Sequence, residues 1–98
     1  TTPGHPELNI KKRIEATTGA LGQGFATAVG MAMAEKYLQG VLEDQMARQN
    51  IIDYNVYALV SDGDLMEGVS YEALSLASKL HLNNINGAFN LFVGLSCI

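Results

Sequence analysis

One stretch limits the fold of this chain more than any other: an apolar segment that leads through an acidic turn into a helical pattern. Residues 54–60 (YNVYALV) are β-branched and aromatic, and nearly continuous in apolar residues at their end, as in a buried parallel strand. The turn Ser61–Asp64 follows. Helical spacing of apolar residues then predicts an amphipathic helix over residues 65–80, from Ala73, Leu76, Ala77 and Leu80. This order is typical of half a doubly wound α/β unit, in which ligands collect beyond the carboxyl ends of the strands.

The first half of the chain predicts a loop followed by another helix. Residues 1–20 contain both prolines, several Thr and Gly residues and a basic group, a composition typical of an extended loop. From Leu21 to Arg48 the chain is rich in Ala, Met and Gly and contains no proline, so we expect a helix, with Gly40 as the candidate position for a break. Its small residues would let a neighbouring backbone or ligand come close. The predicted fold class is α/β, a partial doubly wound parallel sheet that is incomplete in this chain.

Composition argues against nucleic acid and membrane partners. The 6 Lys and Arg residues and 10 Asp and Glu residues give a formal net charge of 6 − 10 = −4, and no basic run is present to neutralise phosphates. No apolar run approaches the roughly 20 residues that a transmembrane helix needs. Cys97, the one cysteine, cannot form an internal disulfide, so we expect a reducing, cytoplasmic compartment.

The acidic turn is a candidate metal site. An aspartate just beyond a strand end presents a hard oxygen ligand, and Mg²⁺ usually binds one or two carboxylates together with phosphate oxygens. Gly63 would let a phosphate group approach bare backbone. Asp and Gly are also common in strand-to-helix turns for conformational reasons, and the turn taken alone favours that simpler interpretation.

Two earlier segments also contain candidate site residues. Residues 17–24 (TTGALGQG) place glycines before a helix, where backbone N–H groups can face a ligand, although a plain Gly-rich connection explains them equally well. They match neither a Walker loop nor a dinucleotide fingerprint. Residues 4–7 (GHPE) put an imidazole in a rigid loop, where it could transfer protons near neutral pH; a lone loop histidine is usually only a surface residue.

Together these segments resemble one family in both order and spacing. The stretches that closely resemble transketolase are residues 2–7 (TPGHPE), 17–24 (TTGALGQG), 29–32 (VGMA), 62–68 (DGDLMEG) and Glu72-Ala73. The resemblance covers residues 1–84, a small fraction of a whole transketolase, and implies part of the N-terminal domain that binds the diphosphate and magnesium. Because the chain also begins at Thr1 without an initiator Met, we expect a fragment of a longer protein.

The resemblance implies an enzyme that transfers a two-carbon ketol unit between sugar phosphates by means of thiamine diphosphate. The cofactor would lie between the two subunits of a homodimer in the cytoplasm. The implied metal is Mg²⁺, which Ca²⁺ or Mn²⁺ could replace. Alone, the fragment is expected to be inactive.

By position, the resemblance also assigns cofactor contacts. Asp62 matches the family's metal ligand, and Gly63 matches its diphosphate contact. Gly19, Ala20 and Leu21 match the segment that contacts the pyrimidine side of the cofactor, largely through backbone atoms. Ala20 stands where the family usually has proline, a change that such backbone contacts should tolerate.

Two further residues are predicted to be catalytic by the same resemblance. His5 matches a histidine that contacts the donor sugar's hydroxyls at the reacting carbons. Glu67 matches a glutamate in an acidic network that joins the two active sites across the dimer.

The chain departs from the family pattern in two places. Ser61 replaces the first glycine of Gly-Asp-Gly, which the turn can absorb if the φ angle of Ser61 is negative. Phe92 stands where the family has the asparagine that completes the metal site, and residues 85–98 are interpreted as a divergent or frame-shifted tail.

Two alternative interpretations stay open. The chain could be a non-enzymatic interaction module or vestigial module that keeps the ancestral turn and helices. Within the enzyme class, dihydroxyacetone synthase shares these motifs, whereas deoxyxylulose-phosphate synthases usually lack Gly-His-Pro-Glu. The motifs leave the sugar specificity open.

Overall fold

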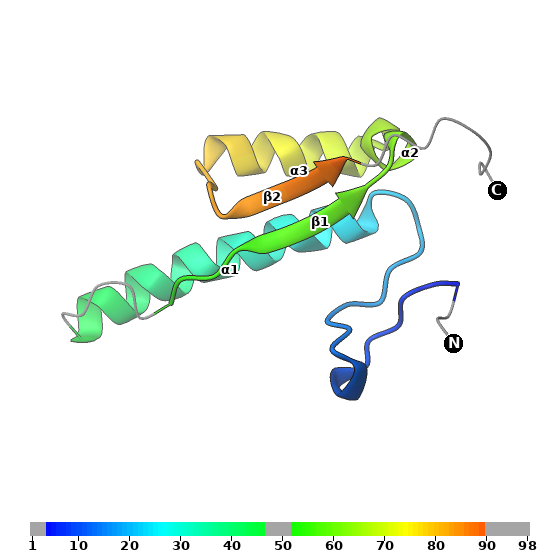
Figure 1. Cartoon of the computed structure of the whole chain (residues 1–98). Coiled ribbons are helices and arrows are strands. Elements are labelled where there is room, and N and C mark those ends of the chain that lie inside the picture. The colour runs from blue at the N-terminus through cyan, green and yellow to red at the C-terminus, as the bar shows by residue number, and fades with distance from the viewer. Residues whose placement is uncertain (1–3, 47–51, 90–98) are drawn as a thin grey trace.

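A computed structural model describes residues 4–46 and 52–89 (Figure 1). In chain order the elements are the 3-10 turn η1 (Ile10–Lys12), helix α1 (Gln23–Met46), strand β1 (Val56–Val60), helices α2 (Asp62–Met66) and α3 (Gly68–Lys79), and strand β2 (Ile85–Phe89). The two strands are parallel and pair from Val56↔Ile85 to Val60↔Phe89. Because α2 and α3 connect them, the second half of the chain is a β-α-β unit. The predicted mixed α/β architecture is confirmed.

The core lies on one face of β1. The buried positions of the strand alternate, so that Val56, Ala58 and Val60 point to the same side. They pack with buried residues of α1 and α3, which are Phe25, Ala28, Val29, Ala32, Ala73 and Ala77. Many of these side chains are small, which lets the two helices approach the strand and each other closely.

The opposite face of β1 is open in the described residues. The side chains of Tyr57 and Leu59 are 77% and 74% exposed. The apolar run is typical of a buried parallel strand, but in the described residues only one face of β1 is covered, because α1 and α3 both contribute to a single core on that face. An apolar strand with one bare face needs further chain or a partner to cover it.

Helix α1 begins directly after a glycine that has a left-handed backbone conformation. Gly22 has a φ angle of +81°, a left-handed conformation that lies outside the helix, and the helix starts at the next residue. The helix continues through Gly40, the candidate position for a break, without interruption. Among the described residues nothing lies within 4 Å of a Cβ built at Gly40.

The helix predicted over residues 65–80 is in fact two helices. Ser61 and Asp64 form a reciprocal capping box, which starts α2 at Asp62, earlier than the apolar pattern indicated. Glu67 is extended, with φ −71° and ψ 140°, and it separates α2 from α3. The φ angle of Ser61 is −100°, so the condition under which the turn absorbs a serine in place of glycine is met.

Strand β2 occupies the first residues of the predicted divergent tail. A buried polar network anchors its start, because Asn84 Nδ2 donates to Glu35 Oε2 at 3.0 Å and to the carbonyl of Ala32 at 3.3 Å. Gln39 Nε2 also donates to Glu35 Oε1. These bonds tie α1 to the residue that precedes β2. The rest of the predicted tail, including Phe92, lies outside the described residues.

Candidate functional site

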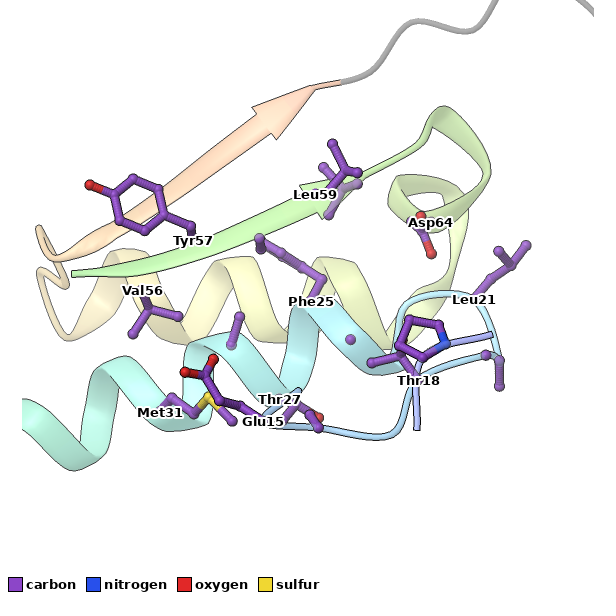
Figure 2. A pocket seen from close by; sticks show the side chains of 18 of the residues that line it. Glu15, Thr18, Leu21, Phe25, Thr27, Met31, Val56, Tyr57, Leu59 and Asp64 are labelled. Carbon is purple, nitrogen blue, oxygen red and sulfur yellow. The ribbon is translucent and has the colours of Figure 1, made fainter. Parts of the chain in front are cut away.

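A cleft of about 940 Å³ runs along β1, between the strand, the N-terminal half of α1 and the chain that precedes it. Figure 2 shows Phe25, Thr27 and Met31 of α1 on one side of β1, and Tyr57 and Leu59, which also line the cleft, on the side of the strand away from α1. Ligand pockets usually have volumes of about 300–1,000 Å³, with mostly apolar walls and a few polar groups. The cleft is therefore large enough for a ligand the size of a cofactor.

The N-terminal arm, residues 4–20, brings the first two candidate segments together. The backbone N–H of Thr18 donates to the carbonyl of Pro6 at 3.2 Å, and the N–H of Leu8 donates to Thr17 Oγ1 at 2.9 Å. As a result, His5 lies beside Gly19, with its Cδ2 atom 3.7 Å from where a Cβ on Gly19 would stand. His5, Gly19, Ala20 and Leu21 all line the cleft.

The acidic turn is tied to the start of α1 by one carboxylate. Asp64 Oδ1 accepts the N–H of Gly22 at 3.0 Å. Asp64 Oδ2 accepts the N–H of Ser61 at 2.9 Å and the Ser61 hydroxyl at 2.8 Å. Burial raises the pKa of the Asp64 carboxyl, but the hydrogen bonds from Gly22 and Ser61 outweigh burial and hold the pKa below its ordinary value of 3.8. Asp64 is therefore ionised at neutral pH.

The two aspartates of the turn have different surroundings. Both oxygens of Asp64 are occupied by donors of the protein. Asp62 is exposed, and within the described residues its carboxylate accepts only the N–H of the adjacent Gly63, at 2.9 Å through Oδ1. A carboxylate offers about four lone-pair directions, so Asp62 keeps free oxygen sites for a cation. Of the two, Asp62 has the more accessible carboxylate, and its role as a metal ligand stays a prediction.

Gly63 and Leu21 bring the turn next to the cleft. A Cβ on Gly63 would lie 3.5 Å from Leu21 Cδ1, and Leu21 lines the cleft. The structure therefore places the predicted metal and diphosphate turn beside the predicted pyrimidine-side segment. The missing side chain of Gly63 leaves backbone accessible at this point.

Glu67 lies outside the cleft. It lies between α2 and α3, is exposed and does not line the cleft. A Cβ on Gly22 would approach Glu67 Cβ to 3.1 Å, so Glu67 packs behind the loop that borders the cleft. Its predicted role across a dimer stays a prediction.

Sequence reasoning missed three residues that build this site: Gly22, Asp64 and Ser70. A Cβ on Gly22 would come within 2.8 Å of both Ser70 Oγ and Val69 Cγ1, and the buried Ser70 hydroxyl donates to the carbonyl of Asp64. A glycine directly before a helix and a second aspartate in the turn were visible signals. Nothing in the local sequence, however, pairs residues that are 42 positions apart.

Within residues 4–46 and 52–89, no group of three or more His, Cys, Asp or Glu side chains converges as a ready metal centre. Asp62 fits the way Mg²⁺ usually binds, through one or two carboxylates with phosphate oxygens and water completing the shell. In the same part of the chain, no helix is long and apolar enough to cross a membrane.

A parallel strand that ends in an acidic turn, beside a Gly-rich loop and an open cleft, defines an α/β ligand-binding unit. Comparison with known proteins identifies which one: a family profile described as "Transketolase, thiamine diphosphate binding domain" matches residues 1–90. The chain belongs to this family.

Individual relatives agree with the profile. The chain is 57% identical to a transketolase of Aquifex aeolicus over 84 residues, which are 86% of the chain. It is 50% identical to a transketolase of Mycobacterium leprae over 86 residues, which are 87% of the chain. The crystal structure of transketolase from Campylobacter jejuni superposes with a TM-score of 0.73, at 45% identity, and covers 91% of the chain and 13% of that structure. The chain spans about 12% of the length of the two relatives matched by sequence.

The comparisons also bear on the C-terminal residues. The profile extends to residue 90, and β2 ends at Phe89, so both continue beyond residue 84. The boundary drawn there from the sequence stays a prediction, as does the nature of residues 90–98.

Proposed function

We propose that this chain is the segment of a transketolase that holds the diphosphate end of thiamine diphosphate together with a divalent cation. The observation that carries the proposal is the meeting of three separate segments at one cleft. His5, Gly19 and Leu21 line it, and the Asp62-Gly63 turn adjoins it through Leu21. Membership of a thiamine-diphosphate-binding family supports the same cofactor.

Each predicted residue has a task consistent with its surroundings. Asp62 would hold Mg²⁺, or Ca²⁺ or Mn²⁺ in its place, through its accessible carboxylate, and the cation would neutralise charge on the diphosphate. Gly63 would let the diphosphate approach the backbone. Gly19, Ala20 and Leu21 would contact the pyrimidine side of the cofactor along the wall of the cleft.

The substrate would approach from the N-terminal arm. His5 is exposed at the cleft and would contact hydroxyl groups of a sugar phosphate. Bound thiamine diphosphate would supply the nucleophilic carbon that carries a two-carbon ketol unit between sugars. The residues of this chain bind and orient, and Glu67 would communicate with the second site of a homodimer.

The complete reaction would require the longer protein. The chain spans about 12% of the length of its relatives, and one face of β1 is bare in the described residues. We propose that in the parent protein this face is covered to complete a doubly wound sheet in a cytoplasmic enzyme. The isolated chain would bind cofactor weakly and transfer no ketol units, because binding at one end does not orient the reacting carbon.

A thermal-shift titration tests the proposal. Thiamine diphosphate with Mg²⁺ should raise the unfolding temperature of the chain more than thiamine with Mg²⁺, or than thiamine diphosphate with a chelator, since only the first combination engages the metal and the diphosphate. Asp62→Ala should abolish the Mg²⁺-dependent part of the shift.

Asp53→Ala is the matched control, because Asp53 is an exposed aspartate that lies outside both the cleft and the acidic turn. It should keep the full shift. Equal stabilisation by thiamine and thiamine diphosphate, or a full Mg²⁺-dependent shift in Asp62→Ala, would contradict the proposed site.

A further inference from the structure

The carboxylate of Asp64 lies between two segments that the proposed function requires to act together. On one side is the loop of Gly19 to Gly22, and on the other is the turn of Ser61 to Gly63. Oδ1 of Asp64 bonds to the loop at 3.0 Å, and Oδ2 bonds to the turn at 2.9 and 2.8 Å. The side chain thus bridges the starts of α1 and α2.

The bridge has supports on both sides. Gly22 is held in its left-handed conformation against Val69 and Ser70, where no Cβ would fit. The Ser70 hydroxyl donates to the main-chain carbonyl of Asp64, so the backbone of Asp64 is fixed as well as its side chain. Loop and turn are therefore both attached to the start of α3.

We infer that Asp64 is a positioning residue, whose carboxylate holds the Gly19–Gly22 loop and the Ser61–Gly63 turn at a fixed separation so that both ends of one cofactor can be bound at once. The inference rests on the proposed function for the identity of that cofactor. Asp64 does not compete with Asp62 for the cation, because its oxygens are directed at protein donors.

A carboxylate is suited to this position for a chemical reason. Three donors converge on Asp64, and they reach both of its oxygens. An asparagine of the same shape has one oxygen and one NH₂ group, so in either orientation its NH₂ would face an N–H donor. Asp64→Asn therefore breaks the link on one side while nearly preserving the volume.

Amide hydrogen exchange with residue resolution tests the link itself. In the unmodified chain the Gly22 N–H should be protected. In Asp64→Asn the exchange of Gly22 or Ser61 should accelerate about tenfold or more, while the amides that pair β1 with β2 keep their rates. Ser61→Ala removes only a hydroxyl and should leave the Gly22 N–H protected from exchange. This exchange rate can be measured even if Asp64→Asn does not fold. Asp53→Asn makes the same charge change at an exposed position and should alter neither rate.

Binding of thiamine diphosphate with Mg²⁺, measured where both proteins are folded by circular dichroism, tests the consequence. The Kd should rise about tenfold in Asp64→Asn and stay unchanged in Asp53→Asn. The inference would be overturned if the Gly22 amide were unprotected in the unmodified chain, or if Asp64→Asn accelerated exchange uniformly across the core. An unchanged Kd in Asp64→Asn would also overturn it. If the unmodified chain bound no thiamine diphosphate, the proposed function would fail, and with it the cofactor part of the inference. The exchange result would still show whether Asp64 joins loop and turn.

Discussion

The backbone N–H of Gly22 donates a 3.0 Å hydrogen bond to Oδ1 of Asp64, 42 residues further along the chain. This bond joins the Gly-rich loop, which precedes α1, to the acidic turn, which follows β1. Each segment alone has an ordinary conformational explanation. Their connection at the edge of a cleft makes them parts of one site.

Replacing Gly22 should be the most damaging small substitution in the chain. An alanine would have to adopt φ near +81° and place its Cβ 2.8 Å from Ser70 Oγ and Val69 Cγ1. Left-handed strain and overpacking together should lower the free energy of unfolding by about 2 kcal/mol or more. Urea denaturation followed by circular dichroism measures this change.

Gly30→Ala is the control, because Gly30 is inside α1 with nothing within 4 Å of a Cβ. It should stabilise the chain by about 0.5–1 kcal/mol. The same destabilisation at both glycines would show that the close contact at Gly22 is not the cause.

The buried network at the start of β2 should be sensitive to loss of one partner. Glu35 is 2% exposed, and Asn84→Ala would remove the donor to its Oε2. Leaving a buried carboxylate oxygen without this donor should cost about 1–3 kcal/mol in unfolding free energy. The exposed neighbour Asn83 provides the comparison, and Asn83→Ala should change stability by less than about 0.5 kcal/mol. Equal effects of the two substitutions would mean that the network contributes nothing specific.

The Asp64 carboxylate should make the loop-to-turn link dependent on pH. Its pKa in the folded chain is below the ordinary 3.8, so its contribution to stability is fully present above pH 3.8 and is lost as the pH falls through the folded pKa. A carbon-13 NMR titration of the side-chain carboxyl, without metal, should give a midpoint below 3.8. A midpoint at or above 3.8 would show that burial outweighs the hydrogen bonds from Gly22 and Ser61.

The bare face of β1 should drive self-association. Tyr57 and Leu59 point away from the core and are largely exposed on a strand that has one unpaired edge in the described residues. The double substitution Tyr57→Thr and Leu59→Thr keeps β propensity while removing apolar surface. Sedimentation velocity over a range of concentrations should show that it reduces association of the isolated chain. If the double substitution left self-association unchanged, the surface responsible for association would lie elsewhere.

Local patterns predicted the main elements of this fold well. The apolar run before Ser61 became β1, and the Ala-rich and Gly-rich stretch became α1. The break between α2 and α3 was missed because the apolar spacing continues across Glu67. That spacing gives no sign that the backbone of Glu67 is extended. β2 was missed because Asn86 and Gly87 interrupt its apolar pattern, and the strand is defined by pairing with β1.

The sequence named the residues of the proposed site but not the contacts that bring them together. His5, Gly19, Leu21 and Asp62 could be named from short motifs and from the resemblance to a family. The choice of Asp62 over Asp64 as the free carboxylate depends on which donors surround each of them, and these donors include Gly22, which only the folded chain brings near. Contacts between residues far apart in sequence are the information that local patterns lack.

The most direct test of the central claim is a binding footprint on the chain. Backbone amide NMR shifts, or hydrogen exchange, should be followed while thiamine diphosphate is added at constant Mg²⁺. Two segments should respond together, Gly19 to Leu21 and Asp62 to Gly63, and neither should respond fully when Mg²⁺ is replaced by a chelator. Changes confined to the polar pocket around Glu35, Gln39 and Asn84, or a response of one segment without the other, would contradict a single cofactor bound between the loop and the turn.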